Sequence, residues 1–109
     1  MITMLSRRIP KTLIDTLTDT GDNSSDVYAI PHVADGVITW QSIVVGTPSA
    51  ISLQLLGAMN SGDTFTELDA SANVSGEMRH VSPVNVRFIK VRQVSRTSGT
   101  SVSIQVLVN

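Results

Sequence analysis

Residues with a branched β-carbon constrain the fold of this sequence more than any other feature. Val, Ile and Thr together make up 34 of the 109 residues. Side chains of this kind are stiff about χ1 and fit a pleated strand better than a helix. Straight-chain helix formers are scarce, with only two Glu and two Lys. The sequence therefore predicts a chain built almost entirely of β-strands.

Short apolar runs alternate with turn signals along the whole chain. Apolar side chains occupy every second position in 51–55 and again in 102–108, which predicts strands with one buried and one solvated face. The breaks contain Gly, Pro or Asp, as in Asp35-Gly36, Gly46 to Pro48 and Ser98-Gly99. We expect seven to nine short strands in an all-β, antiparallel, jelly-roll-like β-sandwich.

Three stretches need separate interpretation. Residues 12–18 fit a helix that begins near Pro10 or a strand, and their Thr content favours the strand. Residues 81–94 carry apolar side chains throughout and are predicted as one long strand. Residues 1–11 form either an N-terminal arm that docks on a neighbour or the first strand of the sheet, and 12–109 form the single β-sandwich domain.

Charge and cysteine content exclude several classes of protein. The formal net charge is −1, whereas general nucleic-acid and membrane-surface binders need a strong basic field. The chain has no cysteine, so it has neither disulfides nor a Cys-based zinc site. We find neither a signal peptide nor a transmembrane segment, and we therefore expect the chain to fold in the cytoplasm where it is made.

No pattern of residues indicates an enzyme, a metal or a cofactor. Only His32 and His80 are available as a histidine base, and no serine lies in a Gly-x-Ser-x-Gly turn. The acidic residues at 15, 19, 22 and 26 raise the question of calcium, but their spacing matches no EF-hand. We interpret them as Asp side chains that cap a polar turn.

Basic and aromatic residues are the other candidates for a binding site. Cations recur at 87, 90, 92 and 96, but single-strand nucleic-acid binders need aromatic platforms and this strand offers only Phe88. We interpret these cations as a solubilising face, or as a basic stripe that meets an acidic partner. Trp40 is expected in the core and Phe65 near a hairpin tip. An exposed ring on Tyr28, Trp40 or Phe65 would instead favour sugar binding.

Two segments resemble small virion proteins of tailed bacteriophages. The stretch 51–69 is similar to a hairpin whose Gly-Ser-Asn-Asp-Gly-like turn precedes an aromatic residue, although Ala58-Met59 departs from the usual polar pair. The stretch 83–92, with the strand 102–108, is similar to the two closing strands of those proteins. The resemblance implies an accessory structural protein of a phage particle without an active site. Discoidin-like and carbohydrate-binding sandwiches share this layout.

We therefore expect a non-enzymatic virion protein that binds and stabilises the assembled phage capsid as a decoration or cement protein. Its partners would be the major capsid protein or other virion proteins, and it would be a homo-oligomer. The alternatives are a neck, tail or fibre component and a carbohydrate-binding module; specific nucleic acid, membranes and cofactors are not expected. The candidate interface residues are Met1, Ile2, Met4, Leu5, Arg7, Arg8, Arg87, Lys90 and Arg92.

Overall fold

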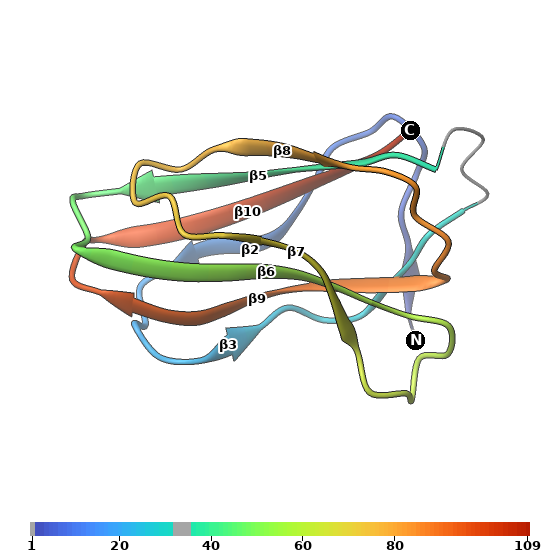
Figure 1. Ribbon diagram of the computed structural model, residues 1–109, viewed down its shortest axis with the longest axis horizontal. Coiled ribbons are helices and arrows are strands. Elements are labelled where there is room, and N and C mark those ends of the chain that lie inside the picture. The colour runs from blue at the N-terminus through green and yellow to red at the C-terminus, as the bar shows by residue number, and fades with distance from the viewer. Residues whose placement is uncertain (1, 32–35) are drawn as a thin grey trace.

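Two β-sheets pack face to face in the computed structural model, which describes residues 2–31 and 36–109 (Figure 1). Ten strands and no helix lie within these residues, which confirms the expected all-β sandwich. The count exceeds the seven to nine strands expected because three strands are only two residues long. Within the same part of the chain, no helix is long and apolar enough to cross a membrane.

Each sheet collects strands from distant parts of the sequence. All pairings are antiparallel except that between β1 and β4. The four-stranded sheet has the order β2 (Lys11–Leu17), β10 (Ser101–Val108), β5 (Ile38–Val45) and β8 (Met78–Val81). The six-stranded sheet has the order β1 (Thr3–Met4), β4 (Tyr28–Ala29), β9 (Phe88–Thr97), β6 (Ala50–Ala58) and β7 (Thr66–Ser71), and β3 (Asn23–Ser24) also pairs with β9.

The chain crosses from one sheet to the other at most of its connections. Only β3 to β4 and the β6–β7 hairpin join strands that lie in the same sheet. β2 pairs with the last strand, β10, and the crossings place strands from both halves of the chain in each sheet. This Greek-key arrangement is that of a jelly roll, as expected. The preference for a strand over a helix in residues 12–18 is confirmed by β2.

The single long strand predicted over residues 81–94 is wrong. β8 ends at Val81 in the four-stranded sheet, and β9 begins at Phe88 in the six-stranded sheet. Residues 82–87 cross the end of the sandwich between them. Val84 is buried in this crossing, and its backbone N–H donates to Gly36 O at 2.8 Å. Apolar side chains recur here because the connection covers the core, so they do not indicate a continuous strand.

Alternating side chains from both sheets fill the core. Leu53, Leu55, Ile89 and Ile104 have no solvent exposure, and Trp40 is almost fully buried among them. The alternation predicted for 51–55 and 102–108 is confirmed, since the apolar positions face inward. Burial of each such side chain contributes roughly 1.5–3 kcal/mol to the stability of the fold. The two sheets therefore hold the surface residues in fixed positions.

Part of the N-terminal segment pairs with the six-stranded sheet. Thr3 and Met4 pair in parallel with Tyr28 and Ala29. The N–H of Leu5 donates to Ala29 O at 2.8 Å, and the Leu5 side chain is only 4% exposed in the core. The segment is therefore fixed at an edge of the six-stranded sheet.

Candidate functional site

Exposed apolar and cationic side chains gather along the N-terminal segment. Met4 is 60% exposed, whereas its neighbour Leu5 points into the core, as the alternation of an extended chain requires. Ile2 and Ile9 are also exposed, and the turn before β2 presents Arg7 and Arg8 to solvent. With the exposed Arg87 described below, we call this set the N-terminal patch; it comprises Ile2, Met4, Arg7, Arg8, Ile9 and Arg87.

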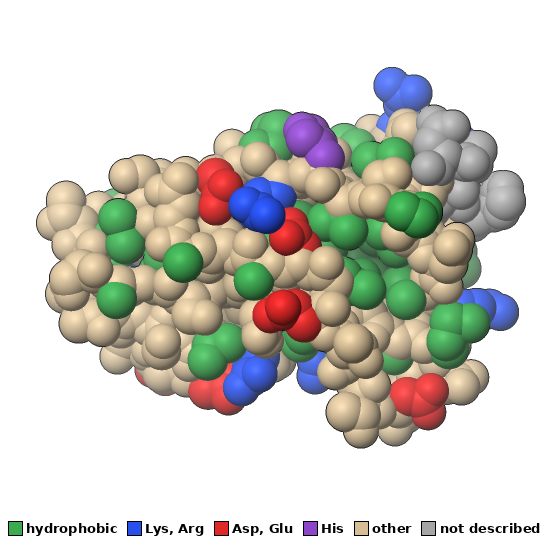
Figure 2. All heavy atoms as spheres, in the orientation of Figure 1, with side chains coloured by type: hydrophobic (Ala, Val, Ile, Leu, Met, Phe, Trp, Pro, Cys, Tyr) green, Lys and Arg blue, Asp and Glu red, His purple; other side chains and the backbone are tan. Residues whose placement is uncertain are grey.

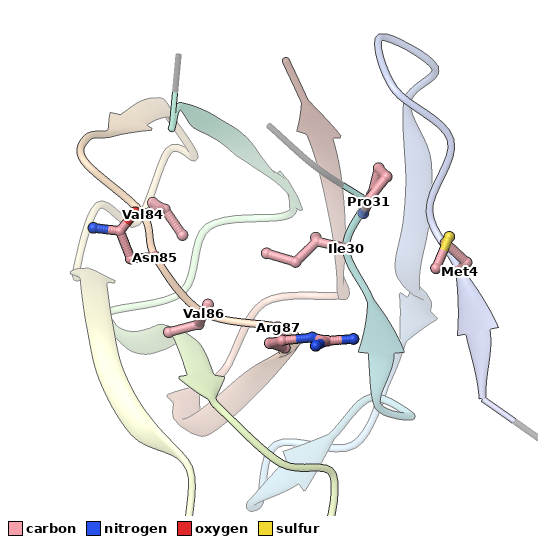
Figure 3. A pocket seen from close by; sticks show the side chains of 7 residues that line it. All are labelled: Met4, Ile30, Pro31, Val84, Asn85, Val86 and Arg87. Carbon is pink, nitrogen blue, oxygen red and sulfur yellow. The ribbon is translucent and has the colours of Figure 1, made fainter. Parts of the chain in front are cut away.

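A hollow of about 470 Å³ opens between Met4 and Arg87 (Figure 3). β4 lies between β1, which carries Met4, and the crossing segment that ends at Arg87. The Ile30 N–H donates to Arg87 O at 2.9 Å and fixes this segment beside β4. Five of the seven residues that line the hollow are apolar, and the other two add an amide and a guanidinium. Its lining residues are Met4, Ile30, Pro31, Val84, Asn85, Val86 and Arg87.

Two smaller hollows extend the N-terminal patch along β1. One of about 310 Å³ is lined by Ile2, Tyr28 and Asp26 among others, and one of about 220 Å³ includes Met4 and Ile9. Met4 lines both the large hollow and the smallest one, so the surface is continuous along the segment. This geometry suits a protein partner that inserts apolar side chains.

The arginines of the N-terminal patch form no ion pair with any residue that the structure describes. The ion pairs among the described residues involve Arg79 and Arg92, and none involves Arg7, Arg8 or Arg87. An exposed guanidinium of this kind is free to form a bidentate, charge-assisted hydrogen bond with a carboxylate of a partner. The patch therefore combines exposed apolar side chains and shallow hollows with cations.

Lys90 and Arg92 lie apart from Arg87, on the outer face of β9. Arg92 donates to Asp22 through Nε at 2.8 Å and Nη2 at 2.7 Å, and this hydrogen bonding lowers the pKa of the Asp22 carboxyl. The Lys90 Nζ lies 4.9 Å from the centroid of the Phe65 ring. Both cations thus contact groups of their own chain beside a hollow of about 420 Å³. The predicted interface residue Met1 lies outside the described residues.

A polar cluster that the sequence analysis did not anticipate joins the two sheets between β7 and β8. Figure 2 shows acidic and basic side chains gathered there. Asp69 on β7 accepts hydrogen bonds from Trp40 Nε1 at 2.9 Å and from Arg79 Nε at 2.7 Å. Arg79 also donates to Glu77 at 3.2 Å. The buried indole N–H of Trp40 needs a partner, and only the fold shows that Asp69 supplies it. The cluster connects β7 of the six-stranded sheet to β5 and β8 of the four-stranded sheet.

Protonation of Asp69 is expected to weaken the fold in acid. Burial alone raises the pKa of Asp69, but hydrogen bonds from Arg79 and Trp40 outweigh it and hold the pKa below the ordinary 3.8. A carboxyl with a lowered folded-state pKa stabilises the protein above its unfolded-state pKa, and this stabilisation is lost as the pH falls through the folded-state value. Denaturant unfolding between about pH 6 and pH 2 should show that the free energy of unfolding decreases less in Asp69→Asn than in wild type. Parallel profiles would contradict this assignment.

The histidine and acidic candidates that the structure describes contact neighbouring residues of their own chain. His80 lies on the outer face of β8, with its Nδ1 2.8 Å from Thr39 Oγ1, and His32 lies outside the described residues. Asp19 Oδ1 accepts from the Gly21 N–H at 2.9 Å, which confirms the turn-capping interpretation at that residue. Across the ranges that the structure covers, no three His, Asp or Glu side chains gather as a metal site would require.

The aromatic residues occupy the expected places. Trp40 lies in the core, as expected, and cannot serve as a sugar platform. Tyr28 is half-buried against the core cluster. Phe65 is half-buried, with Lys90 over its ring. Phe65 lies in the segment between β6 and β7, in agreement with its predicted place near the hairpin tip.

Comparisons with known proteins identify a shared fold. No protein-family model matches the sequence, and no curated protein matches it. Several solved structures are similar to it in fold. The SPBc2 prophage-derived protein YomS is 12% identical, with a TM-score of 0.56 over 95% of this chain and 97% of its own. The PBSX exported protein XepA is 13% identical, with a TM-score of 0.68 over 96% of this chain but 39% of its own. The K3 cleaved adhesin domain of Lys-gingipain from Porphyromonas gingivalis is 10% identical, with a TM-score of 0.65 over 92% and 71%.

Proposed function

We propose that this chain is a non-enzymatic structural protein of a phage particle, which binds the assembled capsid as a decoration protein and stabilises it. The observation that carries the proposal is the N-terminal patch, where a hollow with five apolar lining residues lies between Met4 and Arg87, and Arg87 forms no ion pair with another described residue. The likeness of fold to prophage-derived YomS and to XepA supports the phage context. The major capsid protein is the proposed partner.

The mechanism is thermodynamic. Docking buries the exposed side chains of Ile2, Met4 and Ile9 at about 25 cal/mol per Å² of apolar surface. Carboxylates of the capsid pair with the arginines of the N-terminal patch. Each contact is weak, but copies on a symmetric lattice act together. A ligand that binds only the assembled state stabilises that state by mass action.

The number of copies in purified particles tests the proposal. Quantitative mass spectrometry of the particles would give the ratio of this chain to the major capsid protein. A ratio near one, or a simple symmetric fraction of it, is expected for a decoration protein. A handful of copies would support the alternative of a neck, tail or fibre component. Absence from the particles would overturn the virion proposal.

A Met4→Asp substitution should lower the occupancy of particles by about tenfold or more, equivalent to at least about 1.4 kcal/mol. The change replaces an apolar contact with a charge that capsid carboxylates repel. Met59→Asp is the matched control, because Met59 is 57% exposed and lies in the β6–β7 loop outside the N-terminal patch. Occupancy would be measured by adding each variant to stripped particles. Equal occupancy of the two variants would exclude the N-terminal patch as the docking surface.

A carbohydrate-binding module is the second candidate function. The hollow of about 420 Å³ beside Phe65 also contains Asp63 and Arg92, and sugars bind by stacking on rings and hydrogen-bonding to such groups. A sugar would have to displace Lys90 from the ring. Glycan-array binding that Phe65→Ala abolishes and Met4→Asp retains would support this candidate. Absence of glycan binding would leave the virion proposal in place.

A further inference from the structure

Three neighbouring strands of the four-stranded sheet, β10, β5 and β8, share an outer face on which the described residues include no Asp, Glu, Lys or Arg, whereas β2 beside them exposes Lys11 and Asp15. The arginine of β8, Arg79, points toward Asp69 on the other sheet. We call this surface the uncharged face; it consists of Thr39, Gln41, Ile43, Val45, Met78, His80, Ser103, Gln105 and Leu107.

The outer face of the six-stranded sheet shows the opposite character. Lys90 and Arg92 project from β9, and the neighbouring Gln54 donates to Glu67 of β7 at 2.9 Å. Charged side chains keep such a sheet face hydrated and disfavour its association with other copies of the chain. The two outer faces of the sandwich therefore differ in charge. The uncharged face has no charged side chain that would oppose association with another copy.

Exposed apolar side chains concentrate on and beside the uncharged face. Eight large apolar side chains are exposed among the described residues. Ile43, Val45 and Met78 belong to the uncharged face, and Val74 lies in the adjoining β7–β8 loop. This loop lies against β5, because a Cβ placed on Gly76 would sit 2.5 Å from Ser42 O. Half of the exposed apolar side chains thus form one area, which is typical of an interaction surface.

We propose that a second copy of this chain covers the uncharged face, with the two sheets stacked about a two-fold axis. A partner that brought charges to this face would bury them unpaired at high cost. A two-fold axis places the same patch on both sides of the interface, so each copy presents to the other a surface without charges. Gln41 and Gln105 supply donors and acceptors that can pair across the axis.

The size of the face fits a weak, reversible dimer. Three strands spaced about 4.8 Å apart, with up to eight residues rising about 3.3 Å each, cover about 14 by 26 Å. Two such faces bury about 750 Å² in total, which is in the range of weak, transient interfaces. The N-terminal patch stays outside this interface, so a dimer would present two copies of it.

Sedimentation equilibrium of the full chain tests the proposal through one matched pair of variants. Wild type is expected to dimerise reversibly with concentration. Met78→Lys should raise the dissociation constant by about tenfold or more, because it places two like charges in the interface. Met59→Lys should leave it unchanged, since Met59 has nearly the same exposure as Met78, 57% against 55%, on a distant loop. Circular dichroism would show that both variants fold.

Three results would overturn the proposal. Wild type could remain monomeric up to about 1 mM, Met59→Lys could weaken the dimer as much as Met78→Lys, or Met4→Lys could abolish a dimer that Met78→Lys leaves intact. The last result would place the self-association at the N-terminal patch. The inference does not rest on the proposed function, because self-association is measured on the isolated chain and capsid occupancy on particles.

Discussion

The Asp69→Ala variant is expected to unfold about 3 kcal/mol more easily than wild type. Asp69 is the acceptor for the buried indole N–H of Trp40 and for two nitrogens of Arg79. Alanine leaves the indole donor unsatisfied in the core, which costs the desolvation of that group in full. It also removes the tie between β7 and the four-stranded sheet. Urea denaturation followed by the fluorescence of Trp40 would measure the loss.

Asp22→Ala is the matched control for this experiment. Asp22 also binds an arginine through both carboxylate oxygens, and the shortest N–O distance is 2.7 Å in each pair. Its side chain is 55% exposed, however, against 17% for Asp69. Solvated ion pairs contribute little to stability, so Asp22→Ala should unfold like wild type. Equal losses in the two variants would mean that the ion pair itself, and not the buried Trp40 donor, determines the effect.

Local patterns in the sequence were sufficient to predict the architecture. Alternation at 51–55 and 102–108 placed the inward faces of β6 and β10 correctly, because burial on one side imposes a period of two. The same rule failed at 81–94. A connection that crosses the end of a sandwich also buries its apolar side chains, as Val84 does. Hydrophobicity alone does not distinguish such a crossing from a strand.

The candidate site could be predicted only in part. The N-terminal segment stood out by its apolar and cationic residues, but the opposite directions of Met4 and Leu5 depend on the pairing of β1 with β4. Arg87 was grouped with Lys90 and Arg92 because they are close in sequence. The fold instead places Arg87 across β4 from Met4, where both line the same hollow. Contacts of this kind follow from strand order, which a single sequence does not encode in any local signal.

The Gly76→Ala variant is expected to lose about 3 kcal/mol of stability. Gly76 has a φ of +81°, a conformation that residues with a Cβ rarely adopt. A Cβ there would also lie 2.5 Å from the carbonyl oxygen of Ser42, and both atoms belong to backbone that cannot move aside cheaply. The Ser42 N–H donates to Glu77 O at 2.9 Å and the Glu77 N–H to Ser42 Oγ at 3.0 Å, so the clash falls where β8 joins β5.

Gly62→Ala separates this local strain from the general effect of adding a methyl group. A Cβ on Gly62 would meet no atom within 4 Å, so alanine there should leave stability unchanged or raise it slightly by restricting the unfolded chain. Displacement of β8 in Gly76→Ala would also move Met78 out of the uncharged face and Arg79 away from Asp69. Dimerisation and stability should therefore fall together in this variant. If Gly76→Ala melts at the same denaturant concentration as Gly62→Ala, the β7–β8 loop does not hold β8 in register.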